Sequence, residues 1–99
     1  MIRGTTPTHV FRTDADLSDA EVVYVTYQQG SKKLEKTKEN LTFTDTGFEV
    51  KLTQAETLGF KSGGVNAEVQ IRARFADGTA VASDVIVVPV SKIIKGGEI

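Results

Sequence analysis

The chain has 99 residues, a size typical of one domain built around a single hydrophobic core. It contains no cysteine, which excludes disulfides, a thiol nucleophile and a cysteine-based zinc site. Twelve basic and thirteen acidic residues leave a formal net charge of −1, so we expect no general electrostatic attraction to nucleic acid or to an anionic membrane. The first residues lack the apolar core of a signal peptide. The longest aliphatic run, Val85–Val90, is far short of the roughly 20 residues that span a bilayer. We therefore expect one soluble domain over residues 1–99, with short flexible termini, which is intracellular unless an assembly carries it.

The first third of the chain predicts three strands joined by polar connections. Gly4–Thr13 is rich in threonine and forms the first predicted strand, with Pro7 near its start, where a missing N–H does no harm. Glu21–Gln29 is dense in β-branched and aromatic residues, which is typical of a strand. A turn at Gly30 leads into Lys32–Asn40, which we expect to return beside it as a hairpin.

Two-residue alternation marks the strands that follow. In Phe48–Leu52 the apolar and charged residues alternate, and in Val65–Phe75 the alternation is longer and more regular. The polar positions of the longer stretch are Asn66, Glu68, Gln70, Arg72 and Arg74. Such alternation predicts an antiparallel sheet with one buried face and one face in water.

The end of the chain predicts a hairpin and a closing strand. Asp77 and Gly78 form the dipeptide that type I′ hairpin turns favour. The stretch Asp84–Ile94 predicts a long last strand that Pro89 interrupts at an edge or a bulge. Six or seven strands at even spacing predict an all-β, immunoglobulin-like antiparallel β-sandwich.

One short stretch, LTQAETLGF, departs from the strand pattern and predicts a helical turn near residues 53–58. Thr53 can cap the turn, and Glu56 can complete a reciprocal capping box. Gly59 is expected to end it in the left-handed conformation. So short a helix needs support from the rest of the fold, and we expect it to cross between the two sheets. Ala55 is expected to point to the same side as Leu58. The residues expected to tie the turn to the core are Leu52, Leu58 and Phe60.

Few residues have the type and spacing that catalysis or metal binding requires. His9 is the only histidine, and we interpret it as an ordinary strand residue. Asp14, Asp16 and Asp19 lie close together, but an EF-hand would need glycine at Asp19 and glutamate at Val25. Two interpretations stay open for these acids: turn formers in a solvated loop, or a calcium site of another type. We predict no catalytic, cofactor-binding or metal site, no cofactor, and no enzyme activity.

Two other groups of residues predict structural roles. The pairs Gly63-Gly64 and Gly96-Gly97 lack the spacing of phosphate-binding loops, and they predict a turn and a flexible end. Four lysines cluster in Lys32–Asn40 without arginine or the interleaved aromatics of a nucleic-acid site. Lysines on an edge strand oppose unwanted strand pairing, and this is the interpretation we favour. The four are Lys32, Lys33, Lys36 and Lys38.

Arg72 and Arg74 share the polar face of the most regular predicted strand with Glu68 and Gln70. They can anchor a protein interface, where arginine is over-represented. They can equally pair with neighbouring acids on an exposed sheet, and the sequence does not decide between the two.

Five segments carry a resemblance in their order along the chain: MIRGTTPTHVF, VVYVTYQQ, LTQAETLGF, VQIRARFADGTAVASDVIVV and IIKGGEI. This succession resembles the N-terminal domain of siphophage upper baseplate proteins. The resemblance implies a noncatalytic structural protein of a phage or prophage virion, in a tail or baseplate. It also implies contacts with other virion proteins and with copies of itself, and a location in the virion, or in the host cytoplasm before assembly.

The resemblance leaves several positions open. Upper baseplate proteins continue into helical and receptor-facing parts, whereas this sequence ends at Ile99. A small connector, another place on the particle and a nonstructural prophage protein all remain compatible with it.

A different class of function is a carbohydrate- or cell-surface-binding module, which immunoglobulin-like sandwiches often provide. Such sites usually present tryptophan or tyrosine platforms, and this chain has no tryptophan and only Tyr24 and Tyr27. Because these two tyrosines are three residues apart in a strand, we expect them on opposite faces, with at most one exposed.

Overall fold

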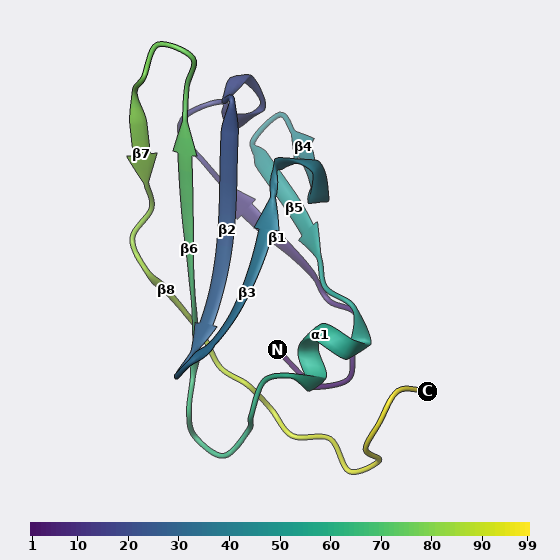
Figure 1. Cartoon of the computed structure of the whole chain (residues 1–99). Helices are drawn as coiled ribbons and strands as arrows, with labels where there is room; N and C mark the ends of the chain where they lie inside the picture. The colour runs from purple at the N-terminus through teal and green to yellow at the C-terminus, as the bar shows by residue number, and fades with distance from the viewer.

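The computed structural model describes residues 1–99 and contains two antiparallel β-sheets (Figure 1). The strands are β1 (Thr8–Arg12), β2 (Val22–Gln29), β3 (Lys32–Thr37), β4 (Leu41–Thr44), β5 (Gly47–Lys51), β6 (Ala67–Arg74), β7 (Ala80–Ala82) and β8 (Ile86–Val88). The helical segments are the 3₁₀ turns η1 (Leu17–Asp19) and η2 (Lys38–Asn40) and the α-helix α1 (Gln54–Leu58). The smaller sheet has the order β1-β5-β4, and the larger has the order β3-β2-β6 with both β7 and β8 on the far side of β6. The prediction of an all-β antiparallel sandwich is confirmed.

The two last strands together occupy one position of the larger sheet. β7 pairs with the end of β6 at Arg72–Arg74, whereas β8 pairs with its beginning at Ala67–Val69. The eight strands therefore fill seven positions, three in the smaller sheet and four in the larger. The larger sheet is one strand wider than the sheet it packs against.

The strand order differs in one respect from that of immunoglobulin constant domains. In those domains the first, second, fifth and fourth strands form one sheet, and the third, sixth and seventh form the other. Here β2 lies instead in the larger sheet, between β3 and β6. The smaller sheet is narrow because it lacks this second strand.

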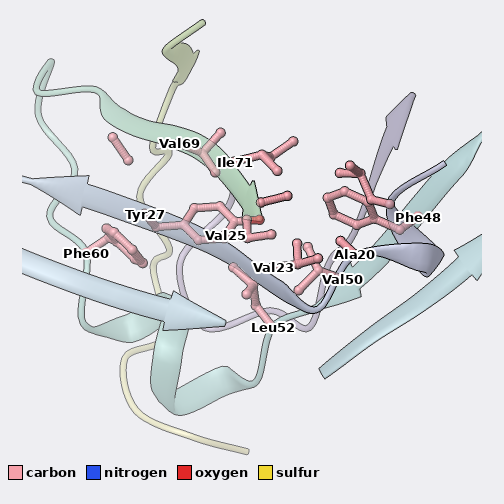
Figure 2. Close-up of a cluster of buried hydrophobic side chains, with 13 residues drawn as sticks. Ala20, Val23, Val25, Tyr27, Phe48, Val50, Leu52, Phe60, Val69 and Ile71 are labelled. Atoms are coloured by element: carbon pink, nitrogen blue, oxygen red, sulfur yellow. The ribbon is translucent and has the colours of Figure 1, made fainter. Parts of the chain in front are cut away.

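The core fills the space between the sheets and comes from the inward positions of the central strands (Figure 2). The predicted alternation is confirmed on β6, and β2 shows the same pattern: in both strands the inward side chains are buried and the outward ones are mostly exposed. The strand residues of the core include Val23, Val25, Tyr27, Phe48, Val50, Val69 and Ile71. Fully burying one such aliphatic or aromatic side chain contributes about 1.5–3 kcal/mol relative to leaving it in water.

α1 connects the smaller sheet to the larger, as the sequence predicts, and its capping box is formed. The hydroxyl of Thr53 accepts the backbone N–H of Glu56 at 3.1 Å, and the Glu56 carboxylate accepts the backbone N–H of Thr53 at 2.8 Å. Leu52 and Phe60, on either side of the helix, are fully buried and anchor it to the core.

Two details of this helix were predicted wrongly. Gly59 has φ −69° and ψ −18°, so it ends the helix in the right-handed conformation, and its N–H donates to the carbonyl of Glu56. Thr57 is the fully buried helix residue, while Leu58 is half-buried and Ala55 exposed. The Thr57 hydroxyl can enter the interior because it donates to the carbonyl of Thr5 at 2.9 Å, which removes the cost of burying it.

The turn after β6 is not the predicted type I′ turn. That type needs positive φ at both central residues, but only Gly78 has it, at 91°. The Gly78 N–H donates to the Phe75 carbonyl at 2.9 Å, and the Phe75 N–H donates to the Thr79 carbonyl at 2.8 Å. This is a three-residue hairpin loop, whose last residue is a glycine in the left-handed region.

The predicted closing strand Asp84–Ile94 is too long, because only Ile86–Val88 pairs with β6, but the predicted interruption at Pro89 is confirmed. The chain also bends between β7 and β8, where Ser83 lies (Figure 1). The hydroxyl of Ser83 accepts the backbone N–H of Ile71 at 3.0 Å, in the place of a backbone carbonyl. The bend separates β7 from β8, and Pro89, which has no N–H, follows the last paired residue, Val88.

The beginning and the end of the chain lie side by side. Ile2 and Ser91 form a parallel bridge, and the terminal amine of Met1 donates to the carbonyl of Pro89 at 2.7 Å. The side chain of Gln54 makes two hydrogen bonds to the backbone of Ile99, at 2.9 and 3.1 Å. The structure has no helix of the length and apolar character needed to cross a membrane.

Candidate functional site

His9 and Tyr27 form a polar link between the two sheets. His9 lies on β1 of the smaller sheet and Tyr27 on β2 of the larger, and a hydrogen bond of 2.6 Å joins His9 Nδ1 to the Tyr27 hydroxyl. Partial burial and then the positive charge of the terminal amine lower the pKa of His9. Burial and then the charge of Glu56 raise the pKa of Tyr27, so the phenol stays neutral. The pair places a neutral imidazole against a neutral phenol inside the sandwich.

The three aspartates after β1 are exposed, and one of them, Asp16, shapes the local turn. Asp16 caps η1, since its carboxylate accepts the N–H and the hydroxyl of Ser18 at 3.0 and 2.5 Å. These bonds, the side-chain one first, lower the pKa of Asp16. No group of three or more histidine or acidic side chains is arranged to hold a metal ion. Of the two interpretations, turn formation is the one with observed contacts for Asp16, while no such contact is seen for Asp14 or Asp19.

The lysine-rich strand β3 is the edge of the larger sheet, as predicted. Its lysines are largely used within the chain. Lys36 forms an ion pair of 2.6 Å with Glu56, and Lys32 lies over the ring of Phe60 at 5.7 Å. Lys38, in η2, donates to the carbonyls of Ser18 and Ala20. Only Lys33 has no partner among these contacts, so the cluster is not a free basic patch.

The ion pair of Glu56 ties α1 to β3. The Glu56 side chain is 22% exposed and that of Lys36 only 12%. Burial alone would raise the pKa of Glu56, but the hydrogen bonds and charge of Lys36, together with the Thr53 N–H, outweigh it and lower that pKa. The carboxylate thus serves the capping box and the helix–sheet contact at once.

An apolar groove of about 580 Å³ opens between β1 and the pair β7 and β8. β1 pairs only with β5, and β7 and β8 pair only with β6, so both walls of the groove are free strand edges. Val81 and Ile86 pair with the buried residues Ala73 and Val69 and therefore face the inter-sheet side, yet each remains 41% exposed. They are uncovered because no strand of the smaller sheet lies opposite them.

The outer face of the larger sheet carries the two arginines and one tyrosine. Tyr24 is exposed there while Tyr27 is fully buried, so the prediction of opposite faces is confirmed. Arg74 approaches Glu21 at 3.7 Å, a contact between half-exposed side chains that contributes little. Arg72 has no ion-pair partner within the chain, and with Tyr24 and Ala80 it lines a shallow hollow of about 310 Å³. The sequence left open whether these arginines pair with neighbouring acids or anchor an interface. Arg74 pairs with an acid, whereas Arg72 is free to contact a partner.

The sequence analysis missed the polar anchor at Gln29. Its buried side-chain amide donates to the carbonyls of Lys61 and Val65 at 2.7 and 2.8 Å and accepts the Lys61 N–H at 2.7 Å. These bonds hold the loop between α1 and β6. A signal was present, because Gln29 continues the inward alternation of Val25 and Tyr27 and is therefore a polar residue at a core position.

No protein-family model, curated protein or solved structure matches this chain. The function therefore has to be inferred from the residues and surfaces described above. Two surfaces stand out: the apolar groove beside β1, and the outer face of the larger sheet.

Proposed function

We propose that this protein is a noncatalytic structural component of a phage or prophage virion, in the tail or the baseplate, that acts through protein–protein contacts. The order of its segments, which resembles an upper baseplate domain, supports the virion assignment. The apolar groove between the free edges of β1 and of β7 and β8 supports action by contact, and it is the observation that carries this part of the proposal.

The groove has the features of a site that receives an extended peptide segment. A strand added beside β1 would widen the smaller sheet to four positions and would lie over Val81 and Ile86, which are now only partly covered. The free backbone groups of β1 would supply the hydrogen bonds, and the apolar walls would receive alternate side chains. We propose that the occupant is an extended apolar segment of a neighbouring virion protein.

Two edges of the sandwich, β3 of the larger sheet and β1 of the smaller, differ in a way that fits this role. β3 carries three lysines, which oppose pairing with a further strand. β1 carries none, and its one charged residue is Arg12 at its end. The lysines of β3 thus oppose strand addition at that edge, whereas β1, beside the groove, can accept an added strand. The protein would wait in the host cytoplasm and be incorporated into the virion as the particle assembles.

Purified particles from a host that carries the gene provide the test. We expect mass spectrometry to find the chain in the tail or baseplate fraction at a fixed ratio to other virion proteins. Val10→Asp, at a 63% exposed position on the wall of the groove, should reduce incorporation strongly.

Thr42→Asp is the matched control, because Val10 and Thr42 both pair with Glu49, on opposite sides of β5. It places the same charge on the other edge of the same sheet and should leave incorporation unchanged. A chain absent from purified particles would refute the virion assignment, and equal incorporation of both variants would refute the role of the groove.

One observation favours a second candidate function, a carbohydrate- or cell-surface-binding module. Tyr24 is exposed beside the shallow hollow, next to Arg72, and a sugar ring can stack on such a platform. This candidate predicts micromolar binding on a glycan array that Tyr24→Ala abolishes. Wild-type chain that binds no glycan would leave the virion proposal as the only one.

A further inference from the structure

The outward positions of the larger sheet form a regular grid, which we call the outer face. Cross-strand pairing places Tyr24 beside Arg72, Thr26 beside Gln70, and Gln28 beside Glu68. On the far side of β6, Ala82 lies beside Arg72 and Val87 beside Glu68. On the other side of β2, the outward residues of β3 are Thr37, Glu35 and Lys33, beside Tyr24, Thr26 and Gln28 respectively.

The outward side chains of β6 carry opposite charges at equal distances from its middle residue, Gln70. Along the outer face β6 presents Glu68, Gln70 and Arg72 in that order, with Glu68 and Arg72 exposed. Four residues of strand separate the acid from the base by about 13 Å, too far for a direct pair. Neither side chain has an ion-pair partner within the chain. A rotation that reverses the strand about Gln70 exchanges the acid with the base.

We propose that a second copy of this chain binds the outer face, with a two-fold axis that crosses the strands at Gln70 and Thr26. Such a rotation turns one face towards the other and reverses the strand direction. Arg72 of each copy then meets Glu68 of the other, which gives two equivalent ion pairs. An interface of this kind is self-complementary, as a two-fold dimer requires.

The neighbouring rows of the grid are also complementary under the same rotation. Tyr24 meets Gln28 of the second copy, so the aromatic ring faces a polar amide across the interface. The methyl group of Ala82 meets Val87 of the second copy, and Val87 is 57% exposed in the single chain. Tyrosine and arginine are among the residues enriched at contact sites of this kind.

The shallow hollow fits this arrangement. It is lined by Tyr24, Arg72 and the small residue Ala80, and so lies beside the guanidinium that has no partner. Glu68 of the second copy would project towards it. A carboxylate that enters a partly enclosed hollow loses some water, which strengthens its attraction to arginine.

One pair of like charges arises at the edge of the interface. The same axis brings Glu35 of β3 opposite Glu35 of the second copy. β3 is the outermost strand, and packed sheets cross at about −30° because each sheet is twisted. The edge strands, β3 on one side and β7 with β8 on the other, therefore diverge from those of the second copy. These two carboxylates remain in water, and the contact of Ala82 with Val87 lies at the periphery of the interface, whose centre is formed by β2 and β6.

The dimer surface meets the groove proposed for virion contacts only at Ala82, which lies at the edge of the larger sheet. The outer face belongs to the side of the larger sheet away from the core, whereas the groove lies between the two sheets. The inference does not depend on the virion assignment, and the two proposals can fail separately.

Complementary charge reversal tests the inference. Light scattering over a concentration series should show that the wild-type chain doubles its mass as concentration rises. Arg72→Glu sets acid against acid, and Glu68→Arg sets base against base, so each variant alone should self-associate about a hundredfold more weakly or worse. An equimolar mixture of the two variants should recover the dimer, because both contacts then join an acid to a base. The double variant Arg72→Glu, Glu68→Arg should dimerise like the wild type.

Lys51→Glu is the control, since Lys51 is exposed on the smaller sheet and lies outside the outer face. It should dimerise normally, and circular dichroism should show that all variants remain folded. A wild-type chain that stays monomeric at every concentration would overturn the inference. So would single variants that still dimerise, or a mixture that remains monomeric.

Discussion

The pair formed by His9 and Tyr27 shows how one hydrogen bond can join the two layers of this sandwich. The imidazole is half-buried, and the phenol is fully buried with its oxygen 2.6 Å from the ring nitrogen. A neutral histidine suits this environment, because a charged ring would lose hydration that its neighbours do not replace. The nearby terminal amine adds to the penalty for a positive charge.

This environment predicts a pH dependence of stability near neutrality. The pKa of His9 is lowered in the folded chain, whereas in the unfolded chain it returns to about 6.5. Below about pH 6.5, His9 thus binds a proton in the unfolded chain but stays neutral in the folded chain. The free energy of unfolding should therefore fall as the pH decreases. The loss should level off once the pH is below the folded pKa, and His9→Gln should flatten this window.

Urea unfolding at a series of pH values between about 7 and 5 measures the effect. The carboxylates with lowered pKa values, Asp16, Glu56 and Asp77, titrate below their usual values near 4 and act in a separate, more acidic window. A His9→Gln variant with the full wild-type slope above pH 5 would contradict this account.

At the scale of elements, α1 is stabilised by the two reciprocal hydrogen bonds of its capping box and by an ion pair with a neighbouring strand. A helix of five residues is too short to be stable alone, so its cap and its contacts decide whether it forms. Thr53 supplies the cap, and the ion pair of Glu56 with Lys36 fastens the first turn to β3. The sequence predicted the cap because its spacing is local. It did not predict the ion pair, which joins residues 20 positions apart.

Thr53→Ala should lower the free energy of unfolding by about 1 kcal/mol, since it removes the acceptor for the Glu56 N–H. Chemical denaturation measures this change. Thr6→Ala, at an exposed position without a side-chain hydrogen bond, should have almost no effect. The Thr53 variant should keep its dimer affinity, and a loss of dimerisation at unchanged stability would show that the helix contributes to binding instead.

The loop between α1 and β6 depends on a single buried amide. Replacing Gln29 by leucine would leave two carbonyls and one N–H without their partner, at a position that water reaches poorly. We expect the free energy of unfolding to fall by about 2–4 kcal/mol. Gln28→Leu, at the next residue but exposed, should change it by less than about 0.5 kcal/mol. Equal effects of the two substitutions would show that the amide bonds do not hold the loop.

The strands themselves were largely predictable because alternation is written locally into β2, β5 and β6. The ends of elements were less so. The bend at Ser83 depends on a hydrogen bond that its hydroxyl accepts from the N–H of Ile71, 12 residues away. No local sequence pattern predicts such a contact. Gly59 adopts the right-handed conformation although glycine is common in the left-handed one, because glycine permits both.

At the scale of the molecule, the pairing partners of the strands could not be predicted. Alternation tells which side chains face inward, but it does not tell that β2 lies between β3 and β6 rather than in the smaller sheet. The groove follows from that placement, since it leaves one sheet narrower than the other. The outer face was visible in the sequence as the polar side of β6, but its pairing with Tyr24 and Val87 needed the register.

The placement of the two candidate surfaces predicts that they act independently. Val10→Asp, which alters the groove, should leave the dissociation constant of the dimer unchanged within about twofold, because distant sites usually act additively. Light scattering of this variant measures it. A large loss of dimerisation would place the groove within the dimer interface and contradict the proposed two-fold axis.

The central pairing of the larger sheet also has a consequence in time. β2 pairs with β6 from Val22 opposite Arg74 to Gln28 opposite Glu68, so half of the chain lies between the partners. During synthesis the middle of this sheet cannot close until the ribosome has released residue 74, and closing so long a loop slows folding. Until then the nascent chain can form the local hairpin of β2 and β3, and the smaller sheet, whose strands β1, β4 and β5 all precede β6. During this interval β3 is the outer strand of the hairpin. The lysines that oppose strand pairing at this edge in the folded protein then oppose pairing of the nascent chain with other chains at the same edge.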